Sequence, residues 1–199
     1  MNPKNITLFV SIAIILLISY NRWTSRPISH EPGVIAPLNP FQQKIINVEP
    51  FNYREFKITP LANFSVEARI LSRKRYYFGR AAKLVPVDLA LGWGAMSDES
   101  ILKSIKITQS NRFYYWFVKS YPIPKQDIIS HSANMHLIPG NSDVRSKIKK
   151  ARKGALVKIS GYLVKATCDD GWRWNSSLRR DDAGNGACEL VWVEEFDLR

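Results

Sequence analysis

An uncharged apolar run close to the N-terminus limits what this chain can fold into. Residues 6–20, ITLFVSIAIILLISY, contain no charged side chain. Extended to Trp23, the run is long enough to cross a thin bilayer core at about 1.5 Å per helical residue. It has no polar face, as a helix of a soluble protein would have, and no signal-peptidase site of small residues follows it. We therefore expect residues 1–23 to form an uncleaved transmembrane signal-anchor; a cleaved signal peptide is the alternative.

Proline is concentrated in the segment after this run. Residues 24–50 hold five of the eleven prolines of the chain. Such a segment favours extended polyproline geometry over helix or sheet, so a linker is expected here. Residues 51–199 have the length of one domain with a hydrophobic core, and the hydrophobic content of the chain, 45%, argues against disorder.

The patterns within this domain are mainly those of β-strands. Apolar and polar residues alternate over 64–71, 155–166 and 188–196, and residues 112–121 are rich in aromatic and β-branched side chains. Gly161 inside one pattern indicates a bulge or a sharp bend. Two short helices are expected, one at 97–105 with Ser97 as its N-cap and one at 141–154 with Asn141 or Ser142 as its N-cap. We predict a mainly β (α+β) fold, a small closed or partly open β-barrel of five or six strands, with an OB-like fold as one option.

The formal net charge of +12 is concentrated in two clusters. Residues 69–83 contain six cations and no acid, and residues 143–158 contain seven cations and one acid. Such clusters bind phosphates or anionic lipid head groups. Aromatic residues in RKRYYFGR, 73–80, also fit a nucleic-acid stacking surface. A solvated basic face is the favoured interpretation, anionic phospholipid is second, and nucleic acid is third.

Three polar residues in apolar surroundings are the candidates for catalysis. Asp88 interrupts the apolar sequence LVPVDLALGWG and needs a cationic partner, for which Arg80 is a candidate. Asn134 and His136 share one face of a strand and could line a pocket with Asp88. His131 and His136 are five residues apart, which places them on different faces of a strand, so no metal and no cofactor is expected.

The only two cysteines enclose a polar segment with two tryptophans. Cys168 ends one strand pattern and Cys188 begins the next, which favours a disulfide between neighbouring strand ends. Disulfides persist in oxidising compartments, so with the anchor they indicate a cytoplasmic N-terminus and a periplasmic domain in a bacterial inner membrane. Trp172 and Trp174 would point to one side of a strand. They either cap the barrel or form a ligand platform with Arg179 or Arg180 at its rim, and Arg80 is a further candidate for ligand binding.

The sequences VPVDLALGWGAMSD, SANMHLIPG, GYLV and DGWRWNSSLRRDDAGNGACELVWVE, between residues 77 and 194, carry a resemblance to known proteins. In combination they resemble a family of small, uncharacterised bacterial membrane-anchored proteins. The resemblance implies an envelope protein and transfers no catalytic residue. We expect a non-enzymatic binding or accessory domain, with the membrane and other envelope proteins as its partners. The alternatives are a hydrolase-like enzyme with a site at Asp88, Asn134 and His136, and a domain that binds anionic phospholipid or nucleic acid through its basic clusters.

Overall fold

One long strand is paired along both of its edges. In this computed structural model, β3 (Phe56–Arg75) is 20 residues long, far longer than the predicted strand at 64–71. It pairs antiparallel with β8 (Leu156–Thr167) and with β4 (Val87–Gly92). Arg69 faces Leu156 in one pairing and Gly92 in the other, so the two partners lie on opposite edges. Register shifts between Pro60 and Ala62 and between Ile70 and Ser72 bend the strand.

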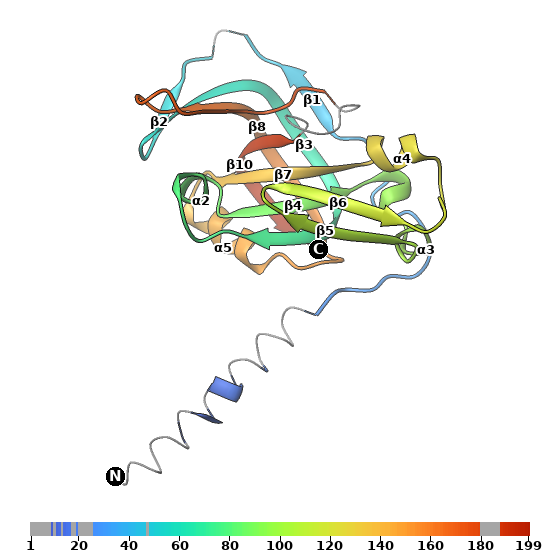
Figure 1. Cartoon of the computed structure of the whole chain (residues 1–199). Helices are drawn as coiled ribbons and strands as arrows, with labels where there is room; N and C mark the ends of the chain where they lie inside the picture. Colours follow the sequence, from blue (N-terminus) through green and yellow to red (C-terminus); the bar gives the residue numbers. More distant parts are fainter. Residues whose placement is uncertain are drawn as a thin grey trace.

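The remaining pairings close a ring that begins and ends at β3 (Figure 1). β4 pairs antiparallel with β7 (Ser132–Pro139), and β7 pairs parallel with β10 (Glu189–Leu198). β10 then pairs antiparallel with β8. The prediction of a mainly β fold with short helices is confirmed. The predicted barrel is shown only in part: its strands pair in a ring.

The structure describes residues 26–46, 48–179 and 188–199, and several residues of the N-terminal run, which are helical. Most of the predicted anchor at 1–23 lies outside the described residues and stays a prediction. No helix formed by the described residues combines the length and the apolar character needed to span a membrane.

Smaller elements surround the ring. Three short strands extend the sheet, and two others form a separate hairpin. The strands are β1 (Phe41–Lys44) and β2 (Phe51–Tyr53) on β3, β9 (Arg173–Asn175) on β8, and the pair β5 (Ile105–Ser110) and β6 (Phe113–Val118). The helices are α2 (Arg80–Leu84), the 3₁₀ helix η1 (Gly94–Ser97), α3 (Glu99–Leu102), α4 (Lys125–Ser130) and α5 (Ser142–Lys150).

Both predicted helices are present. α5 begins as expected, because the Asn141 side chain accepts a hydrogen bond from the Val144 backbone N–H at 2.9 Å. Val144 and Ile148 on its inner face are buried in the core of the ring. α3 is capped by Asp98 instead of the predicted Ser97. The sequence did not predict α2 and α4, since both are single turns too short to show a helical period.

Gly161 permits a close backbone approach where the ring closes. Its φ is +152°, and a Cβ at this position would lie 2.0 Å from the Trp192 carbonyl oxygen. The register of β10 against β8 shifts between Val193 and Glu195, directly beside this contact. The predicted bulge is therefore present, on the partner strand, and the missing side chain of Gly161 gives it room.

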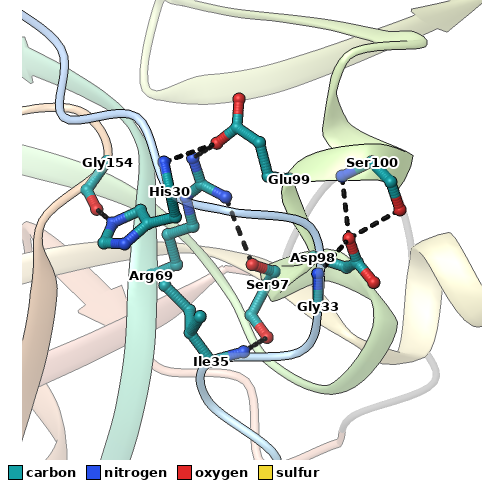
Figure 2. A network of polar contacts seen from close by, with 9 residues as sticks. All are labelled: His30, Gly33, Ile35, Arg69, Ser97, Asp98, Glu99, Ser100 and Gly154. Atoms are coloured by element: carbon teal, nitrogen blue, oxygen red, sulfur yellow. Dashed lines mark hydrogen bonds and ion pairs between the residues drawn. The ribbon is translucent and has the colours of Figure 1, made fainter.

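The described part of the predicted linker is bound to the domain. Residues 28–36, which we call the strap, form a bent segment without regular secondary structure that passes along η1 and α3 (Figure 2). The Ile28 N–H donates to the Lys153 carbonyl at 2.9 Å, and His30 Nε2 donates to the Gly154 carbonyl at 2.7 Å. Ala36 is fully buried and bonds to Gly94 through its carbonyl. The contacts of the domain thus begin well before the predicted boundary at Phe51.

Two acids hold the middle of the strap: Glu99, the first residue of α3, and Asp98, the N-cap of this helix. The Glu99 carboxylate forms an ion pair with Arg69 and accepts a hydrogen bond from the His30 N–H at 3.3 Å (Figure 2). Asp98 accepts one from the Gly33 N–H at 3.1 Å. The hydrogen bond from Arg69, with the His30 N–H, holds the pKa of Glu99 below its usual value against the opposing effect of burial.

The close approach at Gly161 leads to a first prediction. Replacing Gly161 by Ala should lower the free energy of unfolding by about 3 kcal/mol, because the new methyl group overlaps the Trp192 carbonyl in addition to straining φ. Gly171→Ala is the matched control: its φ is +85°, but a Cβ there meets nothing within 4 Å, so only the backbone strain of about 1 kcal/mol is expected. Chemical denaturation measures both, and equal losses would contradict the steric argument.

A second prediction concerns pH. Because the pKa of Glu99 is lower in the folded protein, its contribution to strap docking is fully present above the usual glutamate pKa of about 4.3 and is lost as the pH falls through the lowered value. Hydrogen-exchange protection of the His30 amide should therefore fall towards about pH 3, while that of core Ile159 persists. Glu99→Gln should weaken protection at His30 at every pH. Unchanged protection of His30 in acid would contradict this.

Candidate functional site

Asp88 and His136 meet because of strand register. They are directly opposite each other in the antiparallel pairing of β4 with β7, and both side chains are buried. Asp88 Oδ1 lies 3.0 Å from His136 Nδ1, at ion-pair distance but without hydrogen-bond geometry. The predicted partner Arg80 is not there. Instead, Arg112 Nη1 donates to Asp88 Oδ1 at 2.8 Å.

Arg112 occupies a strained turn and is held from several sides. It follows Asn111 in the two-residue turn of the β5–β6 hairpin, and both residues have positive φ, +50° and +70°. Its guanidinium lies 3.6 Å from the centroid of the Tyr76 ring, and the backbone N–H of Arg112 donates to the Tyr76 hydroxyl at 3.1 Å. Left-handed backbone at a residue other than glycine persists where the surroundings over-determine it, and such residues cluster at functional sites.

The tyrosine beside this ion pair is kept protonated. Burial, and next the charge of Asp88, raise the pKa of Tyr76. The hydroxyl is therefore neutral at physiological pH. It lies beside the Asp88–Arg112 pair without adding a second negative charge to it.

Asn134 connects the hairpin to the ring. Its Nδ2 donates to the Arg112 carbonyl at 2.9 Å, and its Oδ1 accepts from Gln109 Nε2 at 2.7 Å. Cys188 Sγ lies 3.8 Å from both Asn134 Nδ2 and the Arg112 carbonyl. The three predicted candidates, Asp88, Asn134 and His136, are thus brought to one place, with Arg112 as their common partner or neighbour.

An aromatic pocket lies next to this buried group. The Trp174 ring packs against His136 at 4.6 Å between centroids, and Trp172 meets Trp174 edge to face at 6.3 Å. The open pocket has a volume of about 390 Å³. It is lined by Ala81, Arg112, Phe113, His136, Trp172, Arg173, Trp174, Asn175 and Cys188.

Two residues predicted to contact a ligand do not line this pocket. Arg80 Nη2 forms an ion pair with Asp170 Oδ2 at 2.6 Å, which ties α2 to the turn after β8. Arg179 is exposed, and its backbone N–H bonds to the Ser177 hydroxyl at 3.1 Å. The cation between the two tryptophans, Arg173, lines the pocket instead. Residues 180–187, which contain the predicted turn DDAGNG, lie outside the described residues.

The structure shows no disulfide between Cys168 and Cys188. Cys168 packs against a cluster of buried side chains that includes Phe56, Val164 and Leu190, and Cys188 lines the pocket. Burial raises the pKa of the Cys168 thiol, so it remains protonated at neutral pH and is a poor nucleophile. The disulfide stays a prediction.

The structure brings together no metal-binding group in the part of the chain that it describes: no three His, Cys, Asp or Glu side chains gather there. His131, the other histidine of the predicted pair, lies at the end of α4. Its Nδ1 is 2.9 Å from the Asp127 carbonyl.

Sequence reasoning missed Arg112 and Arg173. Arg112 had a detectable signal, since Asn-Arg between two strand patterns separated by two residues predicts a tight hairpin turn. The contact of Arg112 with Asp88 was not predictable, because it depends on the register of β4. Arg173 was passed over because alternation along a strand places its side chain on the face opposite to Trp172 and Trp174.

Comparison with protein-family models, with curated proteins and with solved structures gave no match to this chain.

The buried ion pair gives a third prediction. Asp88→Asn should lower the free energy of unfolding by about 3 kcal/mol, because Arg112, with its side chain 19% exposed, loses its anionic partner. In Asp88→Asn/Arg112→Met the unpaired charge is also gone, so the double variant should be more stable than the sum of the two single losses predicts. Urea denaturation of the four proteins gives the coupling energy. Strict additivity would show that the two residues do not interact.

Proposed function

We propose that this chain is a membrane-anchored binding module that takes a ring-shaped, negatively charged ligand in the pocket of Trp172, Arg173 and Trp174. The observation that carries the proposal is the pocket itself, which combines two partly exposed indoles with an exposed guanidinium. Indole faces stack on flat rings, and a guanidinium pairs with carboxylate or phosphate. Arg173 is the cation of this sequence that has a tryptophan directly before and directly after it.

The ring of strands supports a finer description, an OB-like fold. Taking β3, β4, β7, β8 and β10 as its five strands, α5 precedes the fourth. OB-folds bind oligosaccharides and oligonucleotides at strands two and three and at the loops after strands one and four. The lining of the pocket agrees with this position: Ala81 comes from α2 in the connection after β3, His136 from β7, and the tryptophans from the segment after β8.

The hydrolase-like alternative is less well supported. A general acid or base needs a carboxyl or imidazole group that can reach a substrate. The Asp88 side chain has no exposed surface, and its Oδ1 contacts both Arg112 and His136. The His136 side chain is 3% exposed and is packed by Trp174. This arrangement holds the pocket wall in place, which is what a binding module requires.

The cellular setting is proposed on the sequence alone. Residues 1–23 anchor the chain in a bacterial inner membrane with the N-terminus in the cytoplasm, and the domain lies in the periplasm. The apolar run at 6–20 supports the anchor. Protease added to spheroplasts should then remove the domain, whereas a domain in the cytoplasm would be protected.

Ligand binding is the fourth prediction. Full-length protein in detergent should show saturable quenching of tryptophan fluorescence with an oligogalacturonate, which carries a ring and a carboxylate in each unit. A neutral cello-oligosaccharide of equal length should bind more weakly. Arg173→Ala should raise the Kd for oligogalacturonate about tenfold or more, since it removes the charged contact.

Arg179→Ala is the matched control, because Arg179 has the same charge and lies nearby in sequence but outside the pocket. Its Kd should equal that of the wild type. Equal effects of the two substitutions, or no binding of either sugar, would contradict the proposal. If a single-stranded oligothymidylate binds more tightly than oligogalacturonate, the ligand class is nucleic acid and not an acidic sugar.

A further inference from the structure

The two basic clusters of the sequence meet in the folded protein. The end of β3 lies against the end of α5, where Arg73 Nη1 donates to the Lys149 carbonyl at 3.0 Å and also to the Ala151 carbonyl. Arg75 donates to the same Lys149 carbonyl. The last carbonyls of a helix carry partial negative charge, which draws these guanidinium groups to α5. Burial and the neighbouring Arg75 lower the pKa of Arg73, as expected where cations are crowded.

Ion pairs separate the cations into two groups. Several cluster members have acidic partners: Arg69 with Glu99, Arg80 with Asp170, Lys83 with Glu55, and Lys147 with Asp143 and Asp197. Seven exposed members of the two clusters have no ion pair with any described acid. One is Lys158 on β8. The other six, which we call the basic surface, are Lys74, Arg75, Lys149, Lys150, Arg152 and Lys153.

The N-terminal part of the chain enters the domain at this surface. The first contact of the strap is the hydrogen bond from Ile28 to the carbonyl of Lys153. Gly154 is required for it, because a Cβ there would lie 1.9 Å from the Ile28 carbonyl oxygen. Seven residues, 21–27, lie between Tyr20, the end of the apolar run, and Ile28. Fully extended, the eight steps from Tyr20 to Ile28 span at most about 29 Å.

From these observations we propose that the basic surface docks the domain on the anionic phospholipid head groups of the membrane that holds its anchor. The proposal rests on the anchorage proposed above. A short tether keeps the six cations at high local concentration near the head groups, and their charge is complementary to that of the lipid. The anchor thus favours lipid over nucleic acid as the polyanion that this surface meets.

Exposed aromatic side chains follow the basic surface along the chain. Tyr77 is 72% exposed and Phe78 is 93% exposed, and only Tyr76 separates them from Arg75. Aromatic rings beside cations suit the boundary between head groups and acyl chains. They suit stacked bases as well, so the experiment below includes an oligonucleotide.

A lysine footprint on the full-length chain tests the docking. The protein is reconstituted into phosphatidylcholine vesicles, with or without a third of the lipid replaced by phosphatidylglycerol, and the acylation rate of each lysine is measured by mass spectrometry. Lys44 and Lys57 are the internal controls, since both are exposed and lie on β1 and β3 at the end of the domain opposite α5 (Figure 1).

With phosphatidylglycerol, the acylation rates of Lys149, Lys150 and Lys153 should fall at least about threefold and recover in high salt, which screens the attraction. The rates of Lys44 and Lys57 should not change. The charge-reversed variant K149E/K150E/K153E should lose protection at Lys74, whereas K44E/K57E should keep it. Equal rates in both vesicle types would overturn the proposal. Protection by an oligothymidylate but not by phosphatidylglycerol would overturn it in favour of nucleic acid.

Failure of the anchor is measured separately. Flotation with pure phosphatidylcholine vesicles in alkaline carbonate reports insertion of the N-terminal run, with no contribution from lipid charge. A chain that fails to float disproves the anchorage. In that case the footprint with added anionic vesicles still decides whether the basic surface binds them.

Discussion

The double pairing of β3 is the constraint on which the rest of the structure depends. A strand of 20 residues that holds β8 on one edge and β4 on the other closes the ring, and β7 and β10 complete it from the far side. Closure fixes the register of β4 against β7, and this register brings Asp88 opposite His136. The loops that leave β3 and β8 end at the same side of the ring, where the ion pair of Arg80 with Asp170 joins them.

The candidate site has a rigid interior and an open exterior. Inside, one carboxylate contacts both a guanidinium and an imidazole, and the hairpin turn at Arg112 is held in left-handed backbone by side-chain and main-chain contacts. Outside, two indoles and Arg173 remain accessible. A buried ion pair contributes less to stability than to a defined arrangement, and here the arrangement it defines is the wall on which Trp174 packs.

Local patterns predicted the parts of the fold that local physics determines. Alternation predicted the strands at 155–166 and 188–196, and the Asn141 cap predicted α5, since each signal lies within one element. The hypothesis of a shared site for Asp88, Asn134 and His136 came from polar residues in apolar surroundings. The structure places the three close together, and their catalytic role stays a hypothesis. Arg112 was missed, because its contact with Asp88 needs both a hairpin turn and a strand register. The strap was predicted to be a linker, because the hydrogen bonds that hold it join residues far apart in the sequence. Such bonds leave no periodic pattern.

The docking of the strap determines where a recombinant fragment of this domain should begin. Starting at Phe51, the boundary that composition favours, would remove Ala36 from the core of the ring and leave a vacant hollow there. The Ser97 hydroxyl would also lose the hydrogen bonds that it accepts from the backbone N–H groups of residues 35 and 36. In addition, β1 would be missing from the edge of β3. An uncovered strand edge is a template for association between copies. A fragment that starts at Arg26 keeps the domain whole.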